Sequence, residues 1–227
     1  MKNAPRQMPV QSTVRMRVYK AISGTLVWLA LILQLYLIIN VSIERGLGLW
    51  VGIARYFGYF TILTNILVAL AFTVPLVRPR TRWGQFFSQP NVMSAIAVYI
   101  VMVAIPYSLF LRHIWNPQGW QLVVDEMLHD VSPILYIVFW VLFVPKAALQ
   151  WRNLPAWLIY PLAYLTVTLI SGAIFKWYPY PFLEVDKLGY PQVFLNAVML
   201  SFAFCIVSAV FIGIARLGNV LNLWRDS

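Results

Sequence analysis

The stretch Tyr56–Val77, "YFGYFTILTNILVALAFTVPLV", decides the fold class, because it is apolar over most of its length and has no charged residue. A helix needs about 20 such residues to cross the hydrocarbon core of a membrane. The first half of the stretch nevertheless holds Thr61, Thr64 and Asn65. Polar groups are costly at membrane depth unless they have partners or a function. The stretch therefore predicts a membrane span and a polar site within it.

Five further runs of the same kind extend this reading to the whole chain. Of the 227 residues, 61% are hydrophobic and 11% are charged, which is typical of an integral membrane protein rather than a soluble domain. We expect an all-α protein with six transmembrane helices. Besides Tyr56–Val77, the predicted spans are Ala21–Val41, Val92–Leu111, Met127–Leu149, Ala156–Phe175 and Val193–Ala215.

The distribution of basic residues predicts the topology. Arginines and lysines gather in residues 1–20, in Arg78–Arg82, in Lys146–Arg152 and near the C-terminus, so that alternate connections are basic. The positive-inside rule then places both termini in the cytoplasm. The net charge of +10 indicates contact with anionic lipid, not with nucleic acid. We expect a flexible basic tail over residues 1–20, one membrane domain over 21–217 and a cytoplasmic tail over 218–227.

The polar groups of the second span share one helix face. Gly58, Thr61, Thr64 and Asn65 recur at spacings of three and four, and Thr61 follows Arg55 by six residues, or ~9 Å along a helix. Small and hydroxylated residues at this spacing commonly mark close packing between membrane helices. Taken alone, the face favours packing over chemistry.

The third connection and fourth span supply a possible base. The segment Leu111–Tyr136, "LRHIWNPQGWQLVVDEMLHDVSPILY", contains both histidines, His113 and His129, on the side of the membrane where Thr61 is expected. A histidine can take a proton near neutral pH, and a threonine hydroxyl needs such a base to act as a nucleophile. His113 is more simply explained as an interfacial residue. For His129, an interfacial role and a role as base are equally compatible with the sequence.

The start of the fourth helix decides the depth of His129. Ser132 could cap a helix that begins at Pro133, but a start near Asp125 gives a full span with acids in its first turn and a kink near Pro133. We prefer the second alternative, which places His129 near the depth of Thr61. Asp125 and Glu126 could each orient the imidazole, whereas Asp130 points about 100° away around the helix.

The connection Lys176–Pro191, "KWYPYPFLEVDKLGYP", is rich in proline and aromatic residues. Such a stiff segment could form an interfacial aromatic belt, or it could roof a lipid-binding cleft. The sequence leaves both interpretations open.

Three elements together resemble a known family: "YFTILTN" at Tyr59–Asn65, "DEMLHDVSPILYIVFWVLF" at Asp125–Phe143, and "WYPYPFLEVDKLGYPQVFLN" at Trp177–Asn196. Over nearly its whole length, the chain resembles the bacterial six-helix relatives of the androgen-induced membrane proteins of animals. The animal members are threonine-dependent hydrolases of fatty acid esters of hydroxy fatty acids. By motif, the resemblance implies Thr61 as nucleophile and His129 as its partner, although Thr64 lies one turn away as a second candidate.

The resemblance implies an intramembrane lipid ester hydrolase in the bacterial inner membrane, with a long-chain lipid substrate, no cofactor and a site that faces the periplasm. Asn65 is a candidate oxyanion donor and Asp125 a candidate orienting group. The two histidines and the neighbouring acids lack the spacing of a zinc site. The alternatives are a transporter or channel for a neutral solute or lipid, and a non-enzymatic membrane subunit in which the face of the second span only packs.

Overall fold

A computed structural model describes residues 13–147 and 149–220, and every regular element in them is helical. The elements are α1 (Val14–Glu44), α2 (Leu49–Gly58), α3 (Phe60–Val77), α4 (Arg82–Phe86), α5 (Pro90–Pro106), η1 (Tyr107–Leu111), α6 (Trp120–Glu126), η2 (Met127–Val131), α7 (Ser132–Phe143), η3 (Trp151–Asn153), α8 (Leu154–Phe175), η4 (Pro181–Leu183) and α9 (Val185–Val220).

Six helical segments in the described residues are long and apolar enough to cross a membrane, which confirms the predicted number. Such a set is consistent with an integral membrane protein. The segments are Val14–Glu44, Phe60–Val77, Pro90–Leu111, Trp120–Phe143, Trp151–Phe175 and Val185–Leu217.

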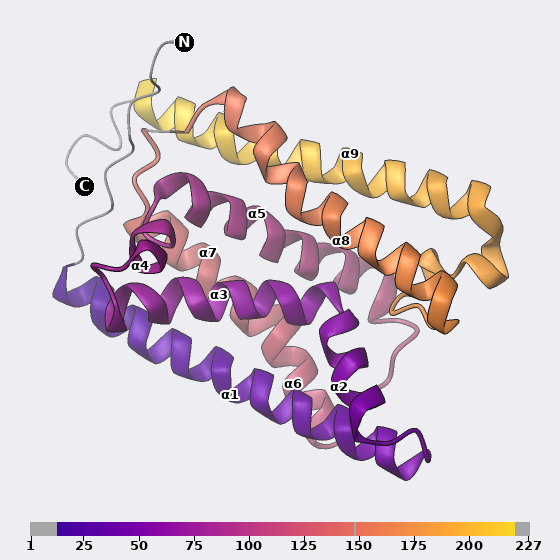
Figure 1. The fold of residues 1–227 in the computed structure, drawn as a ribbon. Helices are drawn as coiled ribbons and strands as arrows, with labels where there is room; N and C mark the ends of the chain where they lie inside the picture. Colours follow the sequence, from indigo (N-terminus) through magenta and orange to yellow (C-terminus); the bar gives the residue numbers. More distant parts are fainter. Residues whose placement is uncertain (1–12, 148, 221–227) are drawn as a thin grey trace.

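The spans pack as a bundle in which α5 is central (Figure 1). Helix α1 packs on α3, α3 packs on α5, and α5 contacts both α7 and α9, while α8 lies against α9. The α8–α9 pair forms one side of the bundle and α1 the opposite side (Figure 1). Helix α1 begins and α9 ends at one end of the bundle, whereas α2 and the connection after α8 lie at the other end. The start of α3, which follows α2 after one residue, lies toward this second end.

The first helix begins earlier than predicted. Its first residue is Val14, and the Thr13 hydroxyl caps it by accepting a hydrogen bond from the backbone N–H of Met16 at 3.2 Å. Residues 14–20 of the tail that was expected to be flexible are therefore helical, and residues 1–12 lie outside the described residues. Helix α9 likewise continues to Val220, so the predicted tail over 218–227 begins inside this helix.

The second predicted span is interrupted. Helix α2 ends at Gly58, Tyr59 has extended backbone angles (φ −85°, ψ 129°), and α3 begins at Phe60. The Tyr164 hydroxyl of α8 donates to the Gly58 carbonyl at 2.8 Å, which satisfies one of the carbonyls left free at the end of α2. Thr61 is thus the second residue of α3 and not a residue six positions into a continuous helix.

The fourth span begins and ends earlier than the predicted Met127–Leu149. It runs from Trp120 to Phe143, with the expected irregularity before Pro133 taking the form of the π-helical turn η2. Lys146 caps this end, because its Nζ donates to the carbonyls of Trp140, Val141 and Val144 at 3.0, 2.9 and 2.9 Å.

Candidate functional site

Thr61 and His129 meet where α3 begins. The Thr61 Oγ1 lies 3.3 Å from the His129 Nε2, although the two residues are far apart in the sequence. Thr61 is 9% exposed and the His129 side chain 14% exposed, so the contact is shielded from bulk solvent. A hydroxyl within hydrogen-bond reach of a histidine nitrogen is the basic geometry of an activated nucleophile.

The second ring nitrogen of His129 fixes the role of the first. Nδ1 lies 3.0 Å from the backbone carbonyl oxygen of Asp125. A carbonyl can only accept, so Nδ1 carries the hydrogen in the neutral ring and Nε2 is left as an acceptor. The nitrogen that faces Thr61 is therefore the one able to take the hydroxyl proton.

Asp125 also places its carboxylate against the imidazole, with Oδ1 3.4 Å from the His129 Nδ1. Its other oxygen, Oδ2, accepts a hydrogen bond from the Tyr107 hydroxyl. The Tyr107 ring stacks on the imidazole with centroids 3.8 Å apart. Of the two acids that could have oriented His129, the structure places Asp125 against it, because Glu126 pairs with Arg112 at 3.2 Å. Asp130 pairs with Arg112 as well.

Tyr107 and His129 both lie in π-helical turns, η1 and η2. Single π-turns are rare and are frequent at functional sites, because the extra residue re-aims the side chains that follow. Here they occur beside Pro106 and Pro133, whose missing N–H groups interrupt the regular hydrogen-bond ladder. The irregular turns bring the phenol ring and the imidazole face to face.

Tyr180, from the connection between α8 and α9, is a third group at the site. Its hydroxyl oxygen accepts a hydrogen bond from the Thr61 N–H at 3.2 Å and lies 3.3 Å from the Thr61 Oγ1. Burial raises the pKa of Tyr180 to about 12, against the opposing effect of its hydrogen bonds with Thr61. The phenol therefore keeps its proton near neutral pH and can donate it in a hydrogen bond.

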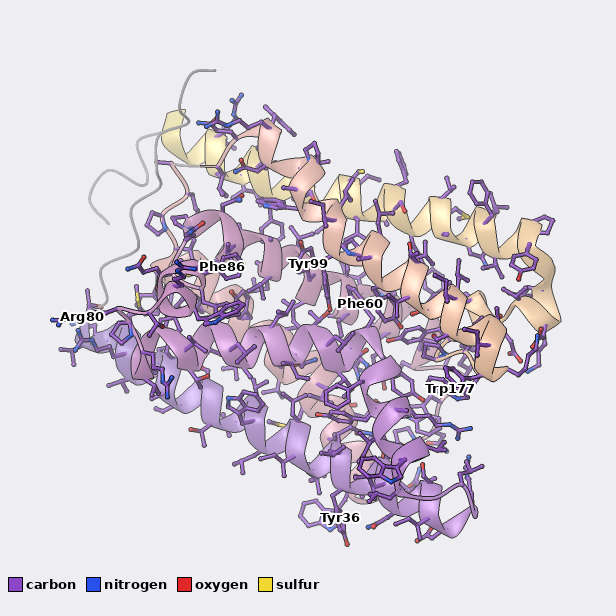
Figure 2. All side chains as sticks on the ribbon, in the orientation of Figure 1. Tyr36, Phe60, Arg80, Phe86, Tyr99 and Trp177 are labelled. Carbon is purple, nitrogen blue, oxygen red and sulfur yellow. The ribbon has the colours of Figure 1, made fainter. Side chains whose placement is uncertain are left out.

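The connection that carries Tyr180 packs closely against two glycines, Gly58 and Gly172. A Cβ on Gly58 would lie 2.7 Å from the Trp177 ring, and a Cβ on Gly172 would lie 2.0 Å from the Tyr178 ring. Figure 2 shows Trp177 at the end of the bundle where α2 lies, with Phe60 further along toward α8. The two glycines therefore leave room for the rings of Trp177 and Tyr178, which precede Tyr180 in the same connection.

Two other polar residues of the predicted face are engaged elsewhere. The Asn65 amide nitrogen donates to the carbonyls of Thr61 and Leu128 at 2.9 and 3.2 Å. The prediction that Asn65 is an oxyanion donor is therefore wrong, because both hydrogens of its amide nitrogen are already donated to these backbone carbonyls. Thr64 is fully buried, with its hydroxyl 3.0 Å from that of Tyr160. The structure thus gives Thr61, and not Thr64, the contact with His129.

Two cavities meet at the Thr61–His129 pair. A small one of about 90 Å³ is almost entirely apolar and lies among α3, α5, α8 and α9. A larger one of about 510 Å³ lies between α1, α2 and the fourth span and is more polar. Both are lined by Thr61, His129, Tyr180, Tyr107 and Leu111.

The sequence pointed to Thr61, His129 and Asp125, but it did not single out Tyr107 or Tyr180. The aromatic connection at Lys176–Pro191 was the available signal for Tyr180, although nothing in it distinguished this tyrosine from its neighbours. His113 is exposed and takes no part in the site. Within the described residues, no group of three or more histidine, cysteine or acidic side chains could hold a metal ion.

Comparison with known proteins adds no assignment. No protein-family model matches the chain, and neither the curated proteins nor the solved structures include a significant match.

Proposed function

We propose that the chain is an intramembrane lipid ester hydrolase in which Thr61 is the nucleophile and His129 the general base. The observation that carries the proposal is the 3.3 Å contact between the Thr61 Oγ1 and the His129 Nε2, combined with the 3.0 Å contact of Nδ1 with a backbone carbonyl. Together they supply a hydroxyl, an acceptor aimed at it and a group that fixes the tautomer, which is the logic of a nucleophile, base and orienting group.

In the proposed reaction, the Thr61 Oγ1 attacks the ester carbonyl while the His129 Nε2 takes the hydroxyl proton. Collapse of the tetrahedral intermediate breaks the bond to the alcohol, and His129 returns the proton to the departing alkoxide. Water then attacks the acyl-threonine with His129 again as base, and the fatty acid leaves as Thr61 recovers its proton. The Asp125 carboxylate beside Nδ1 would stabilise the imidazolium formed in each half of the reaction.

The Tyr180 hydroxyl takes the place of Asn65 as the proposed oxyanion donor. It keeps its proton and lies within 3.3 Å of the attacking oxygen, so a carbonyl carbon bonded to Oγ1 would bring its oxygen close to the phenol. The position of Thr61 in the first turn of α3 adds the positive end of the helix dipole. Both features favour a developing negative charge.

The small cavity supports a lipid as substrate, because its walls are apolar and it lies among membrane-spanning helices. We propose an ester of the hydroxy fatty acid type, a place in the bacterial inner membrane and a site that faces the periplasm. These proposals follow the resemblance to the androgen-induced membrane proteins and the basic residues of the alternate connections.

We expect the substitution Tyr180→Phe to lower kcat by about 10²- to 10³-fold, the usual effect of losing one oxyanion donor, with a much smaller change in KM. The measurement is steady-state hydrolysis of a long-chain ester by purified protein in lipid nanodiscs. Tyr178→Phe is the matched control, because it removes a hydroxyl from the same connection but not from the site. Equal kcat values for Tyr180→Phe and wild type would exclude the phenol as an oxyanion donor.

The experiment that tests the function is reaction of the purified full-length protein with a long-chain fluorophosphonate, followed by mapping of the phosphonylated residue by mass spectrometry. The reagent forms a stable bond with an activated hydroxyl and releases fluoride. We expect the adduct on Thr61, together with loss of esterase activity in proportion to labelling. Labelling on another residue, or absence of labelling and of esterase activity, would overturn the proposal.

A further inference from the structure

The larger cavity has a positively charged wall. Arg45, which follows the last residue of α1, and Arg55, in α2, line the same 510 Å³ space as Thr61 and His129. Neither guanidinium is needed by the hydrolytic steps described above. Two arginines on one cavity that also reaches a reactive group suggest recognition of an anion, since guanidinium groups match carboxylates and phosphates in geometry and charge.

Neither arginine is neutralised by an acid within the described parts of the chain. The ion pairs found there use Arg112, Lys176, Lys187 and His129. Arg112, by contrast, forms ion pairs with both Glu126 and Asp130. The charges of Arg45 and Arg55 thus remain available to a ligand.

Asp125 is the acidic residue that lines this cavity in the described structure, and it is already engaged. One of its oxygens accepts from Tyr107, the other lies 3.4 Å from the His129 Nδ1, and the residue is 5% exposed. Its charge is therefore directed at the imidazole and away from the open space. What remains for a ligand is a cavity with an excess of positive charge.

Aromatic contacts hold one guanidinium in place. Arg55 lies over the Trp177 ring at 5.4 Å, Trp177 meets Tyr59 edge to face at 5.7 Å, and Tyr59 meets Tyr180 in the same way at 5.9 Å. Burial raises the pKa of Tyr59, and the positive charges of Arg55 and Arg45 oppose that rise. Both arginines are therefore close enough to affect Tyr59, and Tyr59 in turn contacts Tyr180, the proposed oxyanion donor.

We propose that Arg45 and Arg55 bind an anionic group, a carboxylate or a phosphate, on the alcohol side of the ester substrate. An ester carbonyl at Thr61 would lie where the two cavities meet, so the groups on either side of it would extend in opposite directions. The acyl chain suits the apolar cavity, whose walls contain no arginine, lysine or acidic residue from the described parts of the chain. The charged half of the substrate suits the cavity with the arginines. This inference rests on the proposed function for its account of the ester.

The test uses full-length protein in nanodiscs of zwitterionic lipid and compares three esters of one fatty acid. The first is an ester of a hydroxy fatty acid with a free carboxylate, the second is its methyl ester, and the third is an acyl ester of glycerol phosphate. We expect wild type to favour the two anionic esters over the methyl ester by about 10- to 100-fold in kcat/KM, mainly through KM. If the ester with the free carboxylate shows the larger preference over the methyl ester, the natural anionic group is a carboxylate. If the ester of glycerol phosphate shows the larger preference, it is a phosphate headgroup.

The double variant Arg45→Gln/Arg55→Gln is expected to lose this preference, because kcat/KM should fall much further for the two anionic esters than for the methyl ester. Lys187→Gln is the matched control, since it removes a positive charge at the same end of the bundle from a residue that does not line the cavity. An unchanged preference in the double variant, or an equal loss for charged and uncharged esters, would overturn the assignment.

A second readout separates this inference from the proposed hydrolysis. An ether analogue of the first ester cannot be cleaved, and its binding can be measured by calorimetry in the same nanodiscs. Binding that requires both the carboxylate of the analogue and the two arginines would support the anion site even if no ester were hydrolysed. Equal binding of the analogue and its methyl ester by wild type would contradict the site even if hydrolysis were observed.

Discussion

Replacement of Thr61 by valine should reduce ester hydrolysis by about 10³-fold or more, which is the usual scale for the loss of a catalytic nucleophile. Valine keeps the shape of threonine and removes only the hydroxyl that lies 3.3 Å from the His129 Nε2 and 3.3 Å from the Tyr180 hydroxyl. Thr61→Ser, which keeps the hydroxyl, should retain part of the activity. The measurement is kcat/KM for a long-chain ester, together with fluorophosphonate labelling of each variant.

Thr64→Val is the matched control for this prediction. It makes the same change one turn further along α3, at a fully buried residue whose hydroxyl contacts Tyr160 instead of His129. Loss of a buried hydrogen bond costs about 1–3 kcal/mol in either variant, so thermal unfolding of the two should be similar. Activity should separate them. A Thr61→Val protein with wild-type activity, or a Thr64→Val protein without activity, would reassign the nucleophile.

Replacement of His129 by alanine should have the second largest effect, a fall in kcat of about 10³-fold. The substitution removes the acceptor for the Thr61 proton and leaves a space beside the 510 Å³ cavity. Added imidazole could enter this space and act as the missing base. We therefore expect partial recovery of His129→Ala activity with increasing imidazole concentration, measured with the same ester.

Two comparisons make the His129 result interpretable. His113→Ala changes an exposed histidine in the preceding connection and should leave activity and imidazole response unchanged. Thr61→Val should not recover with imidazole, because the nucleophile itself is missing. Full activity of His129→Ala without imidazole would show that the imidazole is not the base.

Much of the fold and part of the site could be predicted from sequence, because the relevant signals are local. The number of spans follows from the length of apolar runs, and the contact of Asp125 with His129 follows from their spacing of four on a helix. A start at Pro133 was correctly rejected, because the chain is already helical at His129, but the helix begins at Trp120 and not near Asp125.

The features that sequence reasoning missed depend on contacts between distant segments. The interruption at Tyr59 occurs inside a continuous apolar run, and the contacts that accompany it come from Tyr164 and Trp177 in and after α8. Hydrophobic periodicity cannot reveal such a break. The same limit applies to Tyr180, whose place beside Thr61 depends on how the connection after α8 folds back on α3.

The meeting of two unlike cavities at Thr61 has a consequence for the order in which products would leave. In the proposed reaction, cleavage frees the alcohol first, and this half would depart through the larger, more polar cavity. Its departure would admit water to the acyl-threonine from the same side, while the acyl chain still filled the apolar cavity. The fatty acid would then be the last product released. It would return to the lipid through the apolar cavity, so the two products would leave the site by different routes.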